Sequence, residues 1–312
     1  MESITMSGSH LKEDKEIQLD SIESAIEEIR KGKVIIVVDD EDRENEGDFV
    51  CAADCITPDI INFMATHGRG LICAPLEEQK ADELNLKMMV SDNTALHETA
   101  FTVSIDLIGQ GCTTGISAQD RAKAIKALVN PETKATDLAR PGHIFPLRAK
   151  SGGVLRRTGH TEATIDLARL AGFSPAGVLV EILNEDGTMA RLPQLVEKAK
   201  QHDLKIVSIK DLIAYRMRNE RIIKREVTVP MSTQYGEFEV MAFEQLTTGD
   251  THLAFKKGNW TDGEEVLVRV HSGTESDDIF SAVFENFAMD IQQAMQKISK
   301  ACLLYTSPSP RD

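Results

Sequence analysis

The spacing of hydrophobic residues changes repeatedly between two periods over residues 20–216. Short continuous apolar runs are typical of buried strands, and apolar residues three or four positions apart are typical of amphipathic helices. The pattern predicts helices at 21–30, 58–67, 117–129, 162–172, 193–202 and 208–218, and strands at 33–40, 49–56, 70–76, 101–107, 177–183 and 205–209. Because the two kinds of element intermingle, we expect a layered α/β domain.

After residue 226 the hydrophobic pattern alternates, which is typical of antiparallel strands. It predicts paired strands over 227–245 with a turn at Tyr235 and Gly236, further strands at 252–258 and 264–272, and a helix at 278–299. We therefore expect a flexible tail at 1–18, a first domain at 19–218, a partial β-rich segment at 227–300 and an unstructured tail at 301–312. A non-native origin of that last tail stays open.

Composition narrows the class of protein. The 312 residues carry 35 Lys and Arg against 50 Asp and Glu, a net charge of −15, and the length suits about two folded domains. The acidic balance argues against general binding of nucleic acids or anionic membranes. No apolar run approaches the roughly 20 residues of a membrane span, and no signal peptide precedes the first helix. We expect a cytoplasmic protein that binds neither nucleic acid nor membrane.

An acidic loop follows the first predicted strand and is the strongest chemical signal in the sequence. It reads DDEDRENEGD from Asp39 to Asp48 and includes Arg43, Glu44 and Glu46. Ligands usually bind at strand ends in α/β sheets, carboxylates suit a hard cation such as Mg²⁺, and arginine suits an anionic substrate. A calcium loop is excluded, because aligning its glycine with Gly47 puts Ala53 where a glutamate is required. The alternative is a solvated charged turn.

Three further motifs contain candidate polar side chains. RRTGHTEA (156–163) precedes a predicted helix, where backbone N–H groups and arginines can bind a phosphate or another oxyanion. Two interpretations stay open for each of two residues in this motif. Thr161 either contacts the bound anion or caps the helix, and His160 is either a metal ligand or a surface residue. His143 lies in RPGHIFPL, where a lone histidine is more often a hydrogen-bonded core residue. Glu181 interrupts the apolar strand GVLVEIL, so it is either paired with a cation or tuned as a general base.

These motifs occur together in one known family. DDEDRENEGD, ATHGRGLICAPL, FTVSID, TTGISAQDRA, RPGHIFPLRA, RTGHTEA and GVLVEIL stand in the order and spacing of 3,4-dihydroxy-2-butanone 4-phosphate synthase of riboflavin biosynthesis. The resemblance runs from about Asp20 to Arg216 and rests on long, specific motifs. It implies an α+β fold, with a layered α/β/α domain and a mixed sheet. It also implies a homodimer with active sites at the subunit interface.

The resemblance implies a lyase that converts D-ribulose 5-phosphate to L-3,4-dihydroxy-2-butanone 4-phosphate and formate, with Mg²⁺ or Mn²⁺. It implies Glu44 and His160 as metal ligands, His143 and Glu181 as the essential acid/base pair, and Cys73 near the site. The residues that it implies for substrate binding are Arg43, Glu44, Asp48, Thr114, Arg157, Thr158, Gly159, His160, Thr161 and Glu181, with Thr114 at the phosphate. The residue types fit, because forming an enediol needs a base and a Lewis acid.

Residues 227–299 resemble the start of GTP cyclohydrolase II, through TQYGEF, HLAF and VLVRVHS. That family holds zinc with three cysteines after this last motif, and the resemblance places Thr274, Glu285 and Phe287 at their positions. None of the three is a thiolate ligand, and the sequence ends before the rest of a GTP site. We therefore expect no zinc, no GTP cyclohydrolase activity, and a role as a folding, dimerisation or regulatory appendage.

Two other functions stay open beside the synthase. One is a non-catalytic scaffold that binds other riboflavin enzymes through the C-terminal segment. The joint presence of the acidic loop, both histidines and Glu181 argues against it. The other is a different metal-dependent sugar-phosphate isomerase or aldolase, which would share the first catalytic step but release no formate.

Overall fold

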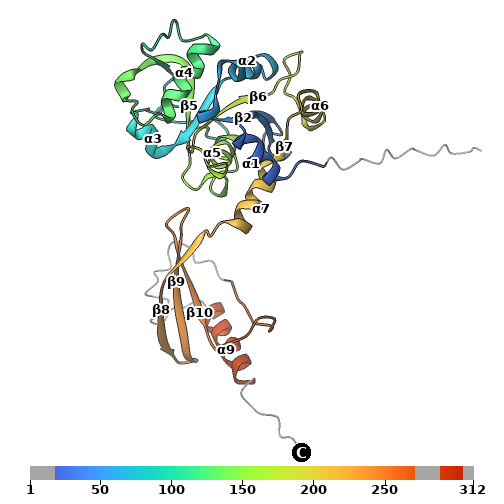
Figure 1. The fold of residues 1–312 in the computed structure, drawn as a ribbon. Coiled ribbons are helices and arrows are strands. Elements are labelled where there is room, and N and C mark those ends of the chain that lie inside the picture. The colour runs from blue at the N-terminus through green and yellow to red at the C-terminus, as the bar shows by residue number, and fades with distance from the viewer. Residues whose placement is uncertain (1–17, 271–288, 305–312) are drawn as a thin grey trace, which may run out of the picture. The chain divides into compact units, whose positions relative to one another are not determined.

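The computed structural model describes residues 18–270 and 289–304, and the chain forms two compact units that divide between Glu220 and Arg221 (Figure 1). Residues 1–17 and 305–312, which make up most of the two predicted tails, lie outside the described residues. The same holds for Thr274, Glu285 and Phe287, at the positions of the zinc cysteines.

The first unit contains a mixed seven-stranded sheet in the order β4-β5-β3-β6-β2-β1-β7. Its pairs β1/β7 and β3/β5 are parallel, and the other neighbours are antiparallel. The strands are β1 (Ile35–Val38), β2 (Gly47–Ala52), β3 (Cys73–Glu77), β4 (Ile105–Leu107), β5 (Leu138–Ala149), β6 (Gly177–Glu181) and β7 (Ile206–Ser208).

Helices cover both faces of this sheet, so the unit has three layers (Figure 1). Successive residues of a strand point to opposite faces: Ile35 and Val37 pack into one apolar core, and Ile36 and Val38 into the other. The first core includes α1 (Ile22–Arg30), α5 (His160–Leu170) and α7 (Ile209–Asn219), and the second includes α2 (Pro58–His67), α3 (Glu78–Glu83), α4 (Ala118–Val129) and α6 (Leu192–His202). Three 3₁₀ helices lie at Ala53–Cys55, Ala135–Asp137 and Gly153–Leu155. The predicted α/β/α architecture with a mixed sheet is confirmed.

Four of the helices begin where capping residues in the sequence place them. Ser21, Thr57, Ser117 and Ser208 each accept a hydrogen bond from a backbone N–H group in the first turn of the helix that follows. Helix α5 differs, because it begins at residue 160 rather than at the predicted 162, after the N-cap Gly159. The polar residues before the predicted helix therefore belong to its first turn.

Two strands of the first unit differ from prediction. Strand β4 covers only the end of the predicted 101–107, because Phe101 and Thr102 form isolated bridges to Leu147 and Met88 rather than a continuous ladder. Strand β5 runs for 12 residues through the RPGHIFPL motif, which the hydrophobic pattern did not predict as a strand. Its parallel pairing with β3 and antiparallel pairing with β4 stabilise it.

The second unit has an antiparallel sheet in the order β10-β9-β8 and a helix. Its elements are β8 (Ile223–Thr233), β9 (Gly236–Gln245), β10 (Thr251–Lys256) and α9 (Met289–Leu304). The predicted turn is present, with Gly236 at φ +106°, where a side chain would be strained. One prediction is wrong: residues 264–270 form no strand, because an alternating pattern needs a paired neighbour. Helix α9 ends at Leu304, whereas the predicted helix ended at residue 299.

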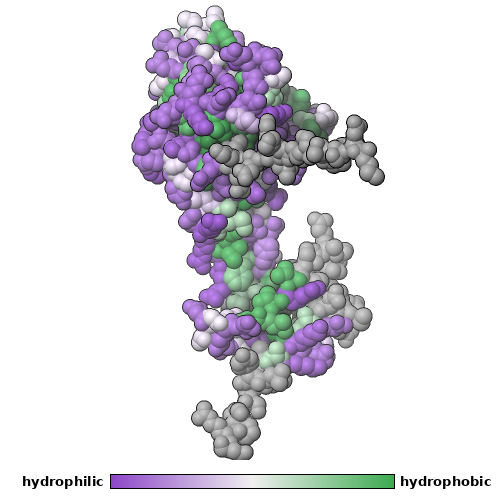
Figure 2. All heavy atoms as spheres, turned by 90° about the vertical axis from the view of Figure 1, so that its right-hand side faces the viewer, coloured by the Kyte–Doolittle hydropathy of each residue, from purple (hydrophilic) through white to green (hydrophobic). Residues whose placement is uncertain are grey.

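Polar side chains dominate the visible surface of the first unit (Figure 2). Scattered apolar residues such as Leu96, which is 90% exposed, interrupt it. Such single exposed side chains are normal on folded proteins. Over 18–270 and 289–304, the structure contains no helix with the length and apolar character to cross a membrane.

Candidate active site

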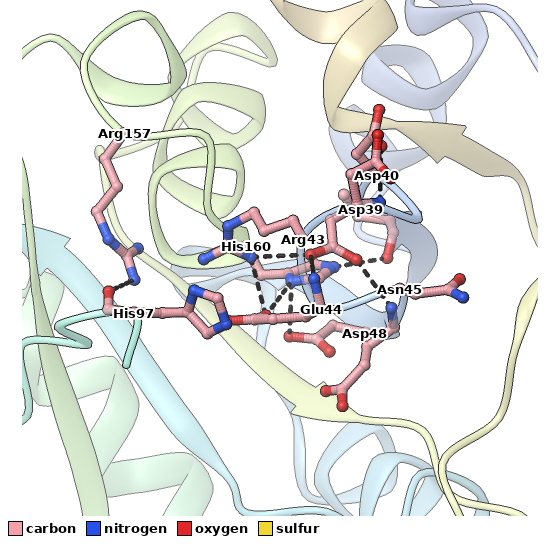
Figure 3. A network of polar contacts seen from close by, with 12 residues as sticks. Asp39, Asp40, Arg43, Glu44, Asn45, Asp48, His97, Arg157 and His160 are labelled. Carbon is pink, nitrogen blue, oxygen red and sulfur yellow. Dashed lines mark hydrogen bonds and ion pairs between the residues drawn. The ribbon is translucent and has the colours of Figure 1, made fainter. Parts of the chain in front are cut away.

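The acidic loop between β1 and β2 folds around the carboxylate of Asp39 (Figure 3). One oxygen accepts a hydrogen bond from the backbone N–H of Glu46 at 2.8 Å, and the other from that of Glu44 at 3.1 Å. The second oxygen also pairs with the Arg43 guanidinium at 2.9 Å. Asn45, at φ +54°, completes the turn. Asp39 therefore fixes the direction of the Glu44 side chain, a role that the sequence did not indicate.

Glu44, Asp48 and His160 come together beside this loop (Figure 3). The Nδ1 atom of His160 lies 3.7 Å from a Glu44 carboxylate oxygen and 4.0 Å from one of Asp48. The other ring nitrogen, Nε2, is 3.2 Å from the carbonyl oxygen of Val37. Since a carbonyl only accepts, Nε2 carries the proton and donates it, which leaves Nδ1 facing the carboxylates.

The protonation states of these three groups are coupled. The hydrogen bond with His160 is the main cause that lowers the pKa of Glu44 to about 2. Burial opposes the charged form of His160, but the carboxylates of Asp48 and Glu44 outweigh it and raise the pKa of the ring to about 9. Burial raises the pKa of Asp48 to about 7, although His160 acts against it. One oxygen of Asp48, Oδ1, is buried and has no hydrogen-bond partner among the described residues.

This donor set suits a divalent cation. Three residues, Asp39, Glu44 and His160, each offer one potential ligand atom. These three atoms lie within 4.8 Å of one another. Both oxygens of Asp39 already accept hydrogen bonds within the loop, whereas Glu44 has only one oxygen paired, with Arg43 at 2.9 Å, so Glu44 and His160 are more available as ligands. Carboxylate oxygens with one imidazole are suitable for Mg²⁺ or Mn²⁺, and the unpaired oxygen of Asp48 adds negative charge beside them.

The RRTGHTEA motif forms the N-terminal end of α5, next to this cluster. Arg157 pairs with the buried Glu162 at 2.6 Å and donates to the carbonyl of His97 at 2.8 Å. A Cβ atom at Gly159 would lie 2.2 Å from the Arg157 guanidinium, so only glycine leaves room for this contact. Thr158 is exposed and Thr161 is buried in the first turn.

The contact of Arg157 brings another histidine to the site. The ring of His97 faces Glu44, with its Nε2 atom 4.0 Å from the carboxylate oxygen that does not face His160 (Figure 3). His97 lies in the segment at 77–100, where the sequence has no clear period, and nothing in its pattern identified this residue. The structure therefore adds an imidazole to the residues predicted.

Glu181 lies beside Asp48, because the two residues are directly paired across β2 and β6. Its carboxylate accepts a hydrogen bond from the backbone N–H of Leu71 at 2.9 Å. Among the described residues no cationic side chain pairs with it, so the interpretation of Glu181 as one half of an ion pair has no support. Cys73 is buried on β3, where burial raises the pKa of its thiol, with Glu181 and Asp48 contributing. It is thus a neutral neighbour of the site.

His143 lies on β5, separated from Asp48 on β2 by two strands of the sheet. Its Nδ1 atom is 2.7 Å from a carboxylate oxygen of Asp106, whose other oxygen accepts the backbone N–H of His143 at 2.9 Å. The side chain is 43% exposed, so His143 is not a core residue. Asp106 was not predicted, although a carboxylate inside the alternating FTVSIDL pattern was a signal for it.

Thr114 is exposed in the connection before α4. Within the described residues no hydrogen bond or ion pair joins Thr114 or His143 to the cluster of Glu44, Asp48 and His160. The predicted site residues therefore form two groups in the chain. Glu44, Asp48, His160, Arg157 and Glu181 lie around the acidic loop, and His143 and Thr114 lie towards the β4/β5 edge.

A buried carboxylate and imidazole cluster at a strand end, inside a three-layered α/β/α domain, defines an acid–base enzyme with a place for a divalent metal. The sequence model of 3,4-dihydroxy-2-butanone 4-phosphate synthase matches residues 23–215, and that of GTP cyclohydrolase II matches residues 224–311. The chain belongs to the 3,4-dihydroxy-2-butanone 4-phosphate synthase family of riboflavin biosynthesis, and it carries a GTP cyclohydrolase II-like segment, as its motifs predicted.

Relatives match over both units. The riboflavin biosynthesis protein RibBA of Cytophaga hutchinsonii is 59% identical over 300 residues, which cover 95% of this chain and 74% of the relative. RibBX of A. baumannii, a two-domain 3,4-dihydroxy-2-butanone 4-phosphate synthase, is 40% identical with a TM-score of 0.74, over 94% of this chain and 95% of that one. A synthase structure with two magnesium ions is 41% identical with a TM-score of 0.62, over 65% of this chain and 99% of that one.

Proposed function

We propose that this chain converts D-ribulose 5-phosphate to L-3,4-dihydroxy-2-butanone 4-phosphate and formate, with Mg²⁺ or Mn²⁺ held by Glu44 and His160. The observation that carries the proposal is the cluster around His160 Nδ1, where two carboxylates converge and a buried oxygen of Asp48 has no partner among the described residues. Such a buried, unsatisfied oxygen indicates that the site is completed by a bound group. The magnesium ions in a relative's structure support the choice of metal.

We assign the roles as the family resemblance implies them. The bound cation acts as a Lewis acid that stabilises an oxyanion on the substrate. Asp48, with a pKa raised to about 7, exchanges a proton near neutral pH. Glu181, paired across the sheet with Asp48, and His143 are the proposed acid/base pair. Arg43, Arg157, Thr158, Gly159 and Thr161 bind substrate around α5, and Thr114 binds its phosphate.

We further propose a homodimer whose active sites take residues from both chains. The two separate groups of site residues support this, because His143 has no described contact with the cluster around His160. Mixing inactive Glu44→Gln and His143→Ala chains should restore activity in mixed dimers if each site needs both groups. Each variant alone, treated identically, is the control. No recovery in mixed dimers of confirmed composition would contradict shared sites.

Formate release from ribulose 5-phosphate is the direct test of the proposed reaction. Metal-dependent formate in proportion to the substrate consumed, abolished by a chelator and restored by Mg²⁺, is the expected result. Consumption of ribulose 5-phosphate without formate would favour an isomerase or aldolase instead. A folded protein that neither consumes the substrate nor releases formate would leave the scaffold function, which no match or contact favours at present.

We propose that the second unit lacks GTP cyclohydrolase activity. After residue 226 the sequence contains a single cysteine, Cys302, whereas the family holds its zinc with three. The family match at 224–311 does not support the absence of GTP cyclohydrolase activity, which stays a prediction. The domain limits at 19–218 and 227–300 and the cytoplasmic location are predictions too. Purified protein should contain no stoichiometric zinc and should leave GTP intact. Zinc-dependent GTP turnover would contradict it.

A further inference from the structure

The acidic loop is held from outside by a residue to which the proposed reaction gives no role. The guanidinium of Arg191 donates through Nη1 to the backbone carbonyl of Glu44 at 2.8 Å, and the same atom donates to the carbonyl of Asn45. Arg191 lies 147 residues after Glu44 in the chain, at the N-cap of α6. The contact therefore joins two distant segments at the backbone of a proposed metal ligand.

The path of the chain after β6 brings Arg191 to this position. Ile182, which follows Glu181, donates its backbone N–H to the carbonyl of Gly47 at 3.0 Å, so it lies beside the start of β2. The chain then turns back, and the N–H of Ala190 donates to the carbonyl of Ile182 at 3.0 Å. Arg191 therefore begins α6 next to the end of the acidic loop.

Helix α6 packs closely against the same end of the loop. Leu195, one turn after Arg191 and 1% exposed, lies against Gly47, where a Cβ atom would be 2.4 Å from its Cδ1 atom. Residues four positions apart lie on one face of a helix, so Leu195 and Arg191 both face the loop. The guanidinium is therefore presented by a packed helix rather than by a flexible surface segment.

Glu44 is bonded through its backbone on both sides of its Cα atom. Its N–H donates to the carboxylate of Asp39 at 3.1 Å, and its carbonyl accepts from Arg191. The next residue, Asn45, has a φ of +54°, which is uncommon for a residue with a side chain, and its carbonyl accepts from the same Arg191 atom. Asp39 and Arg191 thus hold this turn from opposite sides.

Arg191 contacts the loop without using its carboxylates. Both described partners of its guanidinium in the loop are backbone carbonyls, whereas Arg43 contacts the Glu44 carboxylate itself at 2.9 Å. Arg191 therefore orients Glu44 without competing with a cation for the carboxylate oxygens. Groups that orient metal ligands in this way typically contribute about 10- to 100-fold to metal affinity.

We propose that Arg191 is a positioning residue for the divalent-cation site, because it holds the backbone of Glu44 so that the carboxylate faces His160. The inference rests on the proposed function, since it takes Glu44 and His160 as the metal ligands. It gives Arg191 no contact with the metal or the substrate. Loss of Arg191 should therefore weaken metal binding and leave the chemistry at saturating metal almost unchanged.

Binding of Mn²⁺ to the full-length chain, stripped of metal, measures this role without relying on turnover. Electron paramagnetic resonance, which detects free Mn²⁺, should show an affinity about 10- to 100-fold lower in Arg191→Gln. In formate release, the Mn²⁺ concentration for half-maximal rate should rise by a similar factor, while kcat at saturating Mn²⁺ changes little. Arg191→Lys, which keeps a cationic donor, should recover part of the affinity.

Two controls separate positioning from a loss of charge or of stability. Lys200→Gln removes an exposed cation from the same helix and should leave Mn²⁺ affinity unchanged. Leu212→Ala opens a cavity under α7, so it should lower the urea midpoint of unfolding and keep the Mn²⁺ affinity. Arg191→Met keeps an aliphatic stem without the donor, and it takes the place of Arg191→Gln if that variant does not fold.

Unchanged Mn²⁺ affinity in the folded Arg191 variants, while Glu44→Gln weakens binding, would overturn the positioning role. So would a fall in kcat at saturating Mn²⁺ with unchanged affinity, which would give Arg191 a direct part in the reaction. If Glu44→Gln and His160→Ala also bind Mn²⁺ normally, the proposed metal site itself is wrong. Mn²⁺ binding that depends on Arg191, without formate release, would retain the positioning role and reject the proposed reaction.

Discussion

The chemistry of this protein depends on a few side chains whose environment differs from that of ordinary surface charges. Asp39 uses both oxygens to shape a loop, which leaves Glu44 directed at His160. Asp48 is buried with an unpaired oxygen, and its carboxylate helps to keep the neighbouring imidazole protonated. At the scale of single residues, the site thus has excess negative charge that a divalent cation would neutralise.

Glu44→Gln and His160→Ala should each reduce metal-dependent formate release to the level seen without metal. Each removes one of the two proposed ligands, while the fold rests on apolar cores on both faces of the sheet and should remain. Turnover is measured against Mg²⁺ concentration, with circular dichroism to confirm folding. Glu41→Gln, an exposed carboxylate in the same loop, should be neutral. Full activity in either ligand variant would reject the assignment.

The raised pKa of His160 predicts a pH dependence of stability in the metal-free protein. Its folded-state pKa of about 9 exceeds the ordinary 6.5, so protonation contributes stability that is fully present below pH 6.5 and is lost as pH rises through 9. Unfolding free energy from urea titrations should therefore fall between pH 7 and pH 9. The fall should be smaller in His160→Ala. Equal slopes in both proteins would show that another group is responsible.

Asp106→Asn should lower kcat by about 10- to 100-fold with a smaller change in KM, as for other residues that orient a functional imidazole. The carboxylate holds His143 through both its ring and its backbone N–H, so it fixes the orientation of the ring. Asp106→Glu should recover part of the rate, and Asp186→Asn, in an exposed turn, should have no effect. An unchanged kcat in Asp106→Asn would remove this role.

At the scale of elements, the hydrophobic pattern located the capped helices well but missed the short helix α3, which has no side-chain cap. Ser and Thr caps mark helix starts locally, which is why α2 and α4 begin where the sequence places them. Strands depend on distant partners, so the pattern alone could not predict β5 or exclude residues 264–270.

The same limit applies to the site. Motifs identified Glu44 and His160, but His97 and Asp106 reach their partners through tertiary contacts that no local pattern encodes.

Helix α7 is joined to α5 by a buried ion pair, and Arg216→Ala should destabilise the protein by about 3–5 kcal/mol. Arg216 contacts Asp166 at 2.7 Å, and both side chains are at most 5% exposed. Removing the arginine leaves a buried carboxylate, whose pKa burial already raises. Arg30→Ala, which breaks an exposed pair with Glu27, should cost less than about 1 kcal/mol. Urea unfolding of the two variants gives the comparison, and similar losses would contradict it.

At the scale of the whole molecule, the chain combines two units with separate sheets. The first contains every residue proposed for the synthase reaction, since all of them precede the division at Glu220. The second contains the strands that resemble GTP cyclohydrolase II. Because RibBX, with a similar chain length, is described as a two-domain synthase, a synthase with an additional unit has a precedent among the relatives. The contribution of that unit to the reaction is open to direct measurement.

Deleting residues 221–312 should leave synthase activity in place. The cut keeps α7 and the contacts of Arg216 with Asp166 and Glu220, so the first unit retains the network that holds its last helix. Formate release, unfolding free energy and sedimentation of the shortened chain are compared with those of the full chain. A chain ending at residue 215, which lacks Arg216, is the matched control and should be less stable. If the 1–220 chain folds and dimerises but releases no formate, the second unit is part of the catalytic assembly, and the division of labour proposed between the two units is wrong.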